Sequence, residues 1–303
     1  MPSAYVMLKK LEFSRHTPEA RGFMYWERVS EQIYLFTSDR YALVNSIAVV
    51  TDRGTIVVDG LPFPDEAKQI ARFLEIRSGV DFHSLILTHH HMDHVYGLFA
   101  FPNHLDVISS ELCRQRLLEV GEASLAEARE SDPAFKEVSL RIPTITLESG
   151  EFVIDAGNKT LRLFPLPGHT ADNIGVMIEE DDILITGDAV MAIPIIADGD
   201  WEQEIETLQR IRDLEPDTVV QGHGEVILRG EVKTVMDEYI SYLHCIRKEA
   251  ELALKKGRDR KEIWDIPLER CGLERVPLGI ASHQLHVANL LSIYDRLKAE
   301  REG

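Results

Sequence analysis

Residues 88–94, Thr-His-His-His-Met-Asp-His, follow directly on an apolar Leu-Ile-Leu run. An apolar run that ends in imidazoles and a carboxylate predicts a buried strand presenting metal ligands at its C-terminal end. His89 and His91 are two residues apart, so in extended backbone their side chains point to the same side. Asp93 and His94 are adjacent and can turn to opposite sides of a bend, which would give two neighbouring metals separate ligands. Neutral imidazole and carboxylate suit zinc and similar cations.

Three further polar residues stand beside glycine at the ends of apolar runs. They are His169 in Pro-Gly-His-Thr, Asp188 in Thr-Gly-Asp-Ala and His223 in Gln-Gly-His-Gly. Glycine lets the backbone turn sharply and come close to a metal or a substrate. One such histidine alone would more often be structural. Together with the cluster at 88–94, however, the three residues predict one site where metal ligands gather.

Taken in order, the motifs His-x-His-x-Asp-His, Gly-His-Thr, Gly-Asp-Ala and Gly-His-Gly resemble those of the metallo-β-lactamase superfamily. Asp59, in Val-Val-Asp-Gly, matches the first motif of that family, and the similarity covers roughly residues 31–225. The resemblance implies a four-layer αββα sandwich of two mixed β-sheets, with the metals in a cleft along one edge. Asp188 is similar to the bridging aspartate of the dinuclear metallohydrolase branch, which true β-lactamases lack.

The resemblance also implies a role for each candidate residue. The ligands would be His89, His91 and His169 for the first metal, Asp93, His94 and His223 for the second, and Asp188 as a bridge between them. Asp59 would not touch a metal but would hydrogen-bond to a ligand and orient it. A carboxylate that only stabilises a turn is the alternative for Asp59.

The predicted chemistry is hydrolysis. Two dications that share a water lower its pKa toward neutrality, so we expect two Zn²⁺ per chain, with Fe, Mn or Ni left open by the ligand types. The expected activity is attack by a metal-bridging hydroxide on an ester, a lactone, a thioester or a small phosphoester. Asp93 is the expected catalytic residue, because beside the bridging position it can orient the nucleophile and take its proton.

Two other activities on the same fold stay open. A mononuclear iron dioxygenase would use only the first metal position, and the presence of all the second-position ligand types argues against it. A β-lactamase-like amide hydrolase is disfavoured by Asp188. A non-catalytic protein with a decayed site is disfavoured by the intact set of ligands.

Residues next to the ligands are candidates for the substrate pocket. Apolar residues there would form either a pocket wall or ordinary core: Met92, Tyr96, Met191, Ile193, Pro194 and Ile195. Residues 110–141 are rich in Ala and Glu and predict a helical insertion. The His286-x-x-Asn289 pattern resembles C-terminal helices of some family members, which implies a substrate-side role for His286; a structural histidine is the alternative.

The elements that must position these residues alternate in blocks. Strand-forming runs at 31–36, 43–51 and 55–58 predict an antiparallel meander, and a helical pattern at 64–78 precedes the histidine-bearing strand. The second half repeats this order, with runs at 144–147, 151–154, 161–165, 174–178 and 183–186, a helix at 201–214 and a strand at 218–220. Two similar halves predict a layered α/β protein with two sheets face to face and helices outside.

From residue 230 the pattern becomes helical, at 231–256, 259–264 and 282–300. We therefore expect a domain at 1–228 and a C-terminal helical extension at 229–303 that packs on it as one structural unit. No low-complexity linker separates the two parts.

Bulk composition narrows the partners. A formal net charge of −18 disfavours nucleic acid and leaves a small-molecule substrate. The three cysteines are widely spaced and odd in number, which predicts reduced thiols. The first ten residues contain no segment typical of a signal peptide and the chain has no long apolar run, so we expect a cytoplasmic protein with no membrane contact. Both a monomer and a homodimer fit this composition.

Overall fold

The first seven strands form one mixed sheet whose strands follow chain order. Strands β1 to β4 pair antiparallel, as the predicted meander requires, and β4 to β7 pair parallel. The bounds are β1 Tyr25–Ser30, β2 Ile33–Thr37, β3 Asn45–Thr51, β4 Gly54–Val58, β5 Phe82–Ile86, β6 Val107–Ser110 and β7 Ile145–Leu147. The sequence does not predict β1, because this edge strand is largely exposed and has no alternating apolar pattern.

The second sheet has six strands in the order β13-β12-β11-β10-β9-β8. Strands β8 to β11 form the second predicted meander, and β11 pairs parallel with β12 because helix α6 crosses between them. The bounds are β8 Phe152–Asp155, β9 Thr160–Pro165, β10 Ile174–Ile178, β11 Ile183–Ile185, β12 Thr218–Val220 and β13 Ile227–Leu228.

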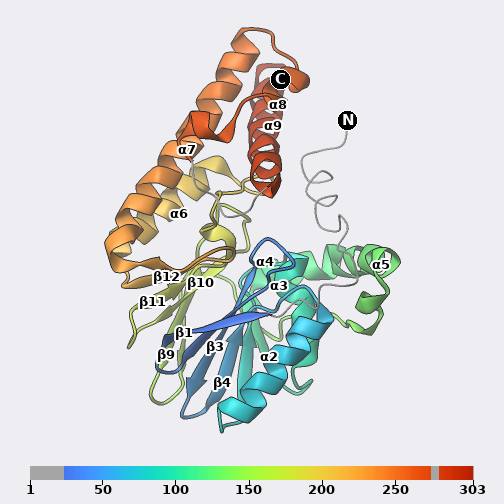
Figure 1. Cartoon of the computed structure of the whole chain (residues 1–303), viewed down its shortest axis with the longest axis vertical. Coiled ribbons are helices and arrows are strands. Elements are labelled where there is room, and N and C mark those ends of the chain that lie inside the picture. Colours follow the sequence, from blue (N-terminus) through green and yellow to red (C-terminus); the bar gives the residue numbers. More distant parts are fainter. Residues whose placement is uncertain (1–23, 274–279, 303) are drawn as a thin grey trace.

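Helices cover the outer face of each sheet (Figure 1). The α-helices are α2 Pro64–Arg77, α3 Met92–Val95, α4 Glu111–Arg116, α5 Glu122–Ser131, α6 Trp201–Leu214, α7 Arg229–Lys255, α8 Arg260–Trp264 and α9 Ile280–Glu302. Shorter turns are η1 Tyr96–Ala100, η2 Leu117–Gly121, η3 Pro133–Glu137, η4 Gly187–Ala189 and η5 Leu268–Cys271. The helical insertion predicted at 110–141 is confirmed over α4 to η3.

Side chains along each strand point alternately to the two faces of its sheet, and so form the layers of the core. Ile33 and Leu35 of β2 point into an aliphatic core between the sheets, while Phe36 faces the helix α2. On the far face of the second sheet, residues such as Leu184 and Val219 pack against α6, α7 and α9. The order helix, sheet, sheet, helix is the four-layer sandwich that the sequence analysis predicts, and that prediction of the fold class is confirmed.

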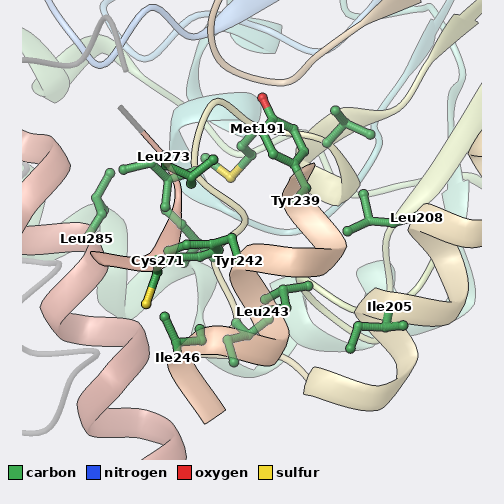
Figure 2. Packing of buried hydrophobic residues seen from close by; sticks show 14 of the residues in the cluster. Met191, Ile205, Leu208, Tyr239, Tyr242, Leu243, Ile246, Cys271, Leu273 and Leu285 are labelled. Atoms are coloured by element: carbon green, nitrogen blue, oxygen red, sulfur yellow. The ribbon is translucent and has the colours of Figure 1, made fainter. Parts of the chain in front are cut away.

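The C-terminal helices share a core with the second sheet. Figure 2 shows Met191, from the loop after β11, beside Tyr239 and Tyr242 of α7, with Leu285 of α9 in the same cluster. Helix α7 begins at Arg229, the residue that opens the predicted extension. The division into a domain and an extension stays a prediction, and the shared core favours the single structural unit.

This computed structural model describes residues 24–273 and 280–302. The first ten residues, for which the sequence predicts no signal peptide, lie outside that range. Among the described helices, none has a stretch both long and apolar enough to span a lipid bilayer.

Candidate metal centre

The candidate ligands lie on loops and short helical segments at one edge of the two sheets. The chain leaves β5 at Ile86, passes through irregular backbone and enters α3 at Met92 with His91 as its N-cap. The β9–β10 loop carries His169. Asp188 lies on the turn η4 after β11, and His223 follows β12. Because β11 and β12 run parallel, their carboxyl ends meet at the same edge and bring Asp188 and His223 together.

The first group of ligand atoms contains His89, His91, His169 and Asp188. The rings of His89 and His91 point to one side, with centroids 4.7 Å apart. His169 Nε2 lies 3.0 Å from His91 Nδ1 and 3.4 Å from Asp188 Oδ2. His89 Nε2 lies 3.6 Å from the same carboxylate oxygen.

The second group contains Asp93, His94 and His223. His223 Nε2 is 3.1 Å from Asp93 Oδ2, and His94 Nε2 is 3.7 Å from that oxygen. Asp188 reaches this group as well, since its Oδ1 is 3.2 Å from His94 Nε2 and its Oδ2 is 3.5 Å from His223 Nε2. The structure thus brings together all seven residues predicted as ligands and places Asp188 between the two groups.

The spacing of these atoms fits metal ions. Ligand atoms about 2.0–2.1 Å from a tetrahedral zinc lie about 3.3–3.4 Å from one another, close to the separations of the two groups. His89 Nε2, His94 Nε2 and Asp188 Oδ1 are buried and have no hydrogen-bond partner in the described part of the chain. Buried polar atoms are normally paired, so the absence of partners at three converging atoms indicates that they are arranged for cations.

Each of the five imidazoles has its other ring nitrogen against an oxygen atom. The pairs are His89 Nδ1 with Thr88 Oγ1 (3.0 Å), His91 Nε2 with Asp198 Oδ2 (3.5 Å), His94 Nδ1 with Asp59 Oδ2 (2.9 Å), His169 Nδ1 with the Ile195 carbonyl (2.7 Å) and His223 Nδ1 with the Ala42 carbonyl (3.0 Å). Such contacts fix the tautomer and the ring plane, and leave the opposite nitrogen with a lone pair for a metal.

Asp59 lies where the sequence places it, behind the ligands. Its Oδ1 accepts the Thr88 backbone N–H (2.7 Å), and its Oδ2 accepts both the Thr88 hydroxyl and the His94 ring N–H. Asp59 has a φ of 60°, a left-handed conformation that is unfavourable for a residue with a Cβ. Strained backbone at a strand end that aims a side chain at a cluster is typical of functional sites.

Burial and neighbouring charges act in opposite directions on the pKa values of the cluster. Burial lowers the pKa of His89 well below its usual range and that of His169 to about 4. Burial also acts against charge on His94 and His223, but the nearby carboxylates outweigh it. Asp188 and Asp93 raise the pKa of His94 well above its usual range and that of His223 to about 10. Metals entering the second group would displace protons from these two rings.

Asp198 is a neighbour of the cluster that the sequence analysis does not predict. Its side chain is 31% exposed, and its carboxylate lies between His91 and His90. His90 itself donates its ring N–H to Asp172 at 2.9 Å. No sequence signal marks Asp198, because it lies in an irregular segment ten residues after Asp188 and only the fold brings it to His91.

For the residues next to the ligands, the structure favours one of the two interpretations left open by the sequence. The apolar residues that could form either a pocket wall or ordinary core are mostly core: Tyr96 is 4% exposed and packs on Phe135, and Met191, Ile193 and Ile195 belong to the cluster shared with α7 and α9. His286 is fully buried, and its Nδ1 lies 3.1 Å from the Tyr242 hydroxyl. The structural role given as the alternative for His286 therefore fits its position better than a substrate contact does.

Comparison of the sequence with models of known protein families identifies the superfamily of this chain. Residues 41–223 match the sequence model of the metallo-beta-lactamase superfamily, which is more than half of the chain. The chain belongs to this superfamily. The prediction made from its motifs is confirmed.

Relatives in the superfamily are distant. The chain is 26% identical over 202 residues to a beta-lactamase-like protein 2 homolog of Caenorhabditis elegans, which covers 66% of this chain and 61% of that protein. It is 30% identical over 190 residues to a hydroxyacylglutathione hydrolase of Cereibacter sphaeroides, which covers 61% of this chain and 63% of that enzyme. The chain thus matches less than two thirds of the length of either relative.

A solved metallo-beta-lactamase from Pontibacter korlensis has the same fold. It superposes with a TM-score of 0.60 at 20% sequence identity and covers 73% of this chain and 99% of that one. Superfamily members bind metals, typically zinc, and the residues gathered here are of the types that could hold them.

Proposed function

We propose that this chain is a dinuclear metal-dependent hydrolase that cleaves carboxylic esters or thioesters, lactones included. One observation carries the proposal: Asp188 Oδ2 lies 3.4 Å and 3.5 Å from ring nitrogens of the two ligand groups, His169 and His223 respectively. A carboxylate in that position fits two neighbouring cations. The relatives named as hydroxyacylglutathione hydrolases, whose substrates are thioesters by chemical type, support an acyl substrate.

The residues that would hold the metals follow from the two groups. His89, His91 and His169 would bind one, Asp93, His94 and His223 the other, and Asp188 both. We propose zinc for both positions. When bound, the two metals supply a water activated at neutral pH and polarise the bond to be cleaved.

Asp93 is the catalytic residue of the proposed mechanism. Its side chain is 15% exposed, whereas those of His94 and Asp188 are almost fully buried, so its carboxylate is the most accessible of the three. Burial would raise the pKa of Asp93, but His94 and His223 beside it lower that pKa to about 2. The carboxylate is therefore ionised at neutral pH and accepts a hydrogen bond from the attacking water, which orients it toward the substrate.

The surroundings of the candidate metal centre support a small substrate that carries little negative charge. Asp198 lies at the exposed side of His91, where a second anion would be repelled. The formal net charge of −18 also disfavours a polyanion such as nucleic acid. The three cysteines, of which Cys113 and Cys271 are buried free thiols, support a cytoplasmic enzyme.

Metal content and hydrolysis test the proposal together. Protein purified without added metal is analysed by inductively coupled plasma mass spectrometry and then assayed on acyl esters, acyl thioesters and phosphoesters. We expect about two zinc ions per chain, and turnover that falls more than about 100-fold in Asp93→Ala and His91→Ala. The control is Asp213→Asn on the last turn of α6, whose side chain is 70% exposed and pairs with Arg212.

Two results would contradict the proposal. Hydrolysis retained by metal-replete Asp93→Ala would remove Asp93 from the mechanism. About one iron per chain, with oxygen consumed and no ester cleaved, would favour the mononuclear dioxygenase.

A further inference from the structure

Asn289 of α9 is a fully buried amide that contacts the loop carrying one of the ligand supports. Its Oδ1 accepts the Ile196 backbone N–H at 3.0 Å, and its Nδ2 donates to the Pro194 carbonyl at 2.6 Å. A backbone N–H can only donate and a carbonyl can only accept, so these two partners fix which way the amide points. The side chain therefore bonds the peptide groups on both sides of Ile195.

Ile195 lies between these two bonds, and its carbonyl accepts the ring N–H of His169 at 2.7 Å. The segment from Ala192 to Asp200 has no regular helix or strand to hold that carbonyl in place. The direction of the Ile195 carbonyl thus depends on the hydrogen bonds that the Asn289 side chain makes to Pro194 and Ile196. Asn289 in turn donates to the Tyr242 hydroxyl at 3.1 Å, and Tyr242 of α7 is fully buried.

His286 completes the chain of contacts. Burial lowers the pKa of His286 to about 4, so its ring is neutral and its Nδ1 can accept the Tyr242 hydroxyl proton at 3.1 Å. The Tyr242 oxygen then has its lone pairs free for the Asn289 amide. Two helices of the C-terminal extension thus anchor one backbone carbonyl at the metal centre.

We propose that Asn289 is a positioning residue for the first group of metal ligands. By fixing Pro194 and Ile196 it directs the Ile195 carbonyl at His169 Nδ1, which holds the ring in the tautomer whose Nε2 can bind metal. The C-terminal extension then helps to orient one of the residues that would bind metal. The inference rests on the proposed metal centre and does not depend on which bond the enzyme hydrolyses.

The test replaces the amide by a group of similar size that cannot hydrogen-bond. Asn289→Leu leaves the Ile196 N–H and the Pro194 carbonyl without their partner. We expect one of the two zinc affinities, measured by competition with a chromogenic chelator, to fall about tenfold, as for other partners of ligand histidines. In the metal-free protein, hydrogen exchange should become faster in residues 190–200.

The matched control is Leu291→Ala on the same helix. Leu291 is 3% exposed in the core cluster, so its truncation lowers the melting temperature through a cavity but touches none of the Asn289 bonds. Both zinc affinities should stay within about threefold of wild type, well inside the loss that a ligand partner causes. If Asn289→Leu does not fold, Tyr242→Phe removes only the hydroxyl bonded to Asn289, and should weaken the same zinc site.

The outcomes separate the inference from the proposed function. Two tight zinc sites in wild type that Asn289→Leu and Tyr242→Phe leave unchanged would overturn the inference alone. The same is true if Leu291→Ala weakens zinc binding as much as Asn289→Leu does, because the effect would then be one of global stability. A wild-type protein that binds no zinc would overturn the metal centre and the inference with it.

Discussion

Glu66 is a carboxyl group buried outside the metal cluster. It lies on the first turn of α2 with no exposed surface, and its Oε1 accepts the Ser38 hydroxyl at 3.1 Å. Burial raises the pKa of Glu66 to about 7, an effect that Ser38 and Arg40 only partly offset. In the folded protein this side chain is therefore protonated at pH values where an unfolded chain would ionise it.

This difference makes stability depend on pH in a defined direction. Between the ordinary pKa of 4.5 and about 7, the folded state binds more protons than the unfolded state. The free energy of unfolding therefore falls as the pH rises through this window. The full difference is of order 3 kcal/mol. Glu66→Gln keeps the acceptor for Ser38 and should abolish this part of the pH dependence.

Urea unfolding of metal-free protein at the two ends of the window measures the effect, because the titration of the metal ligands is common to all variants and cancels in the comparison. Glu75→Gln, at an exposed position of the same helix, is the control and should keep the wild-type slope. An unchanged slope in Glu66→Gln would show that Glu66 is ionised in the folded protein.

At the scale of single residues the sequence predicts the candidate ligands, and the family resemblance adds Asp59 behind them, but the other supports are not predicted. His89, His169 and Asp188 could be identified because they stand at the ends of apolar runs in motifs with fixed spacing. Asp198 and Asn289 could not, since each reaches the cluster only through the tertiary fold. For His286 the sequence leaves a substrate role and a structural role open, and its complete burial favours the structural one.

At the candidate metal centre, the turn after β12 brings the backbone of Gly222 close to the carboxylate of Asp188. Gly222, between β12 and His223, donates its N–H to the carbonyls of Gly187 (2.8 Å) and Val190 (3.2 Å). A Cβ at position 222 would lie 1.9 Å from Asp188 Oδ1, well inside van der Waals contact. Only glycine fits there while Asp188 keeps its place between the two ligand groups.

Gly222→Ala should therefore displace Asp188 and weaken both metal sites at once. We expect zinc content to fall from about two to below about one per chain, and hydrolysis to fall more than about 100-fold, while overpacking lowers the stability of the metal-free protein by about 1–3 kcal/mol. The matched control is Gly230→Ala, where an added Cβ meets no atom within 4 Å. Wild-type zinc content in Gly222→Ala would contradict the bridging role of Asp188.

The elements themselves are largely predictable. Strand β10 and helix α6 begin and end at the predicted residues. Their apolar residues have the spacing of a strand and of a helix, respectively, up to both ends of each element. Strand β1 is missing from the prediction, since pairing with β2 rather than burial defines it. The parallel pairing of β11 with β12 depends on a contact between distant segments, which no local pattern contains.

At the scale of the whole molecule, the C-terminal extension shares its core with the second sheet. The core cluster that α7 and α9 share with the second sheet includes Tyr242, Leu184 and Val219, all fully buried. Removing the chain after residue 228 would expose this apolar face to water, at about 25 cal/mol for each Å². The predicted monomer or homodimer stays a prediction.

We therefore expect the sandwich and the extension to unfold together. Trp26 lies in β1 on the first sheet, and Trp201 of α6 donates its ring N–H to the Leu243 carbonyl of α7 at 2.9 Å. In a Trp264→Phe background, proteins in which Trp26→Phe or Trp201→Phe leaves a single tryptophan as reporter should give coincident fluorescence transitions in urea, matching the loss of helix by circular dichroism. A chain ending at residue 228 should fail to fold. Two separate transitions, with the Trp201 environment lost first, would instead make the extension a domain of its own, and would leave the Asn289 contact as a docking interaction between two folded units.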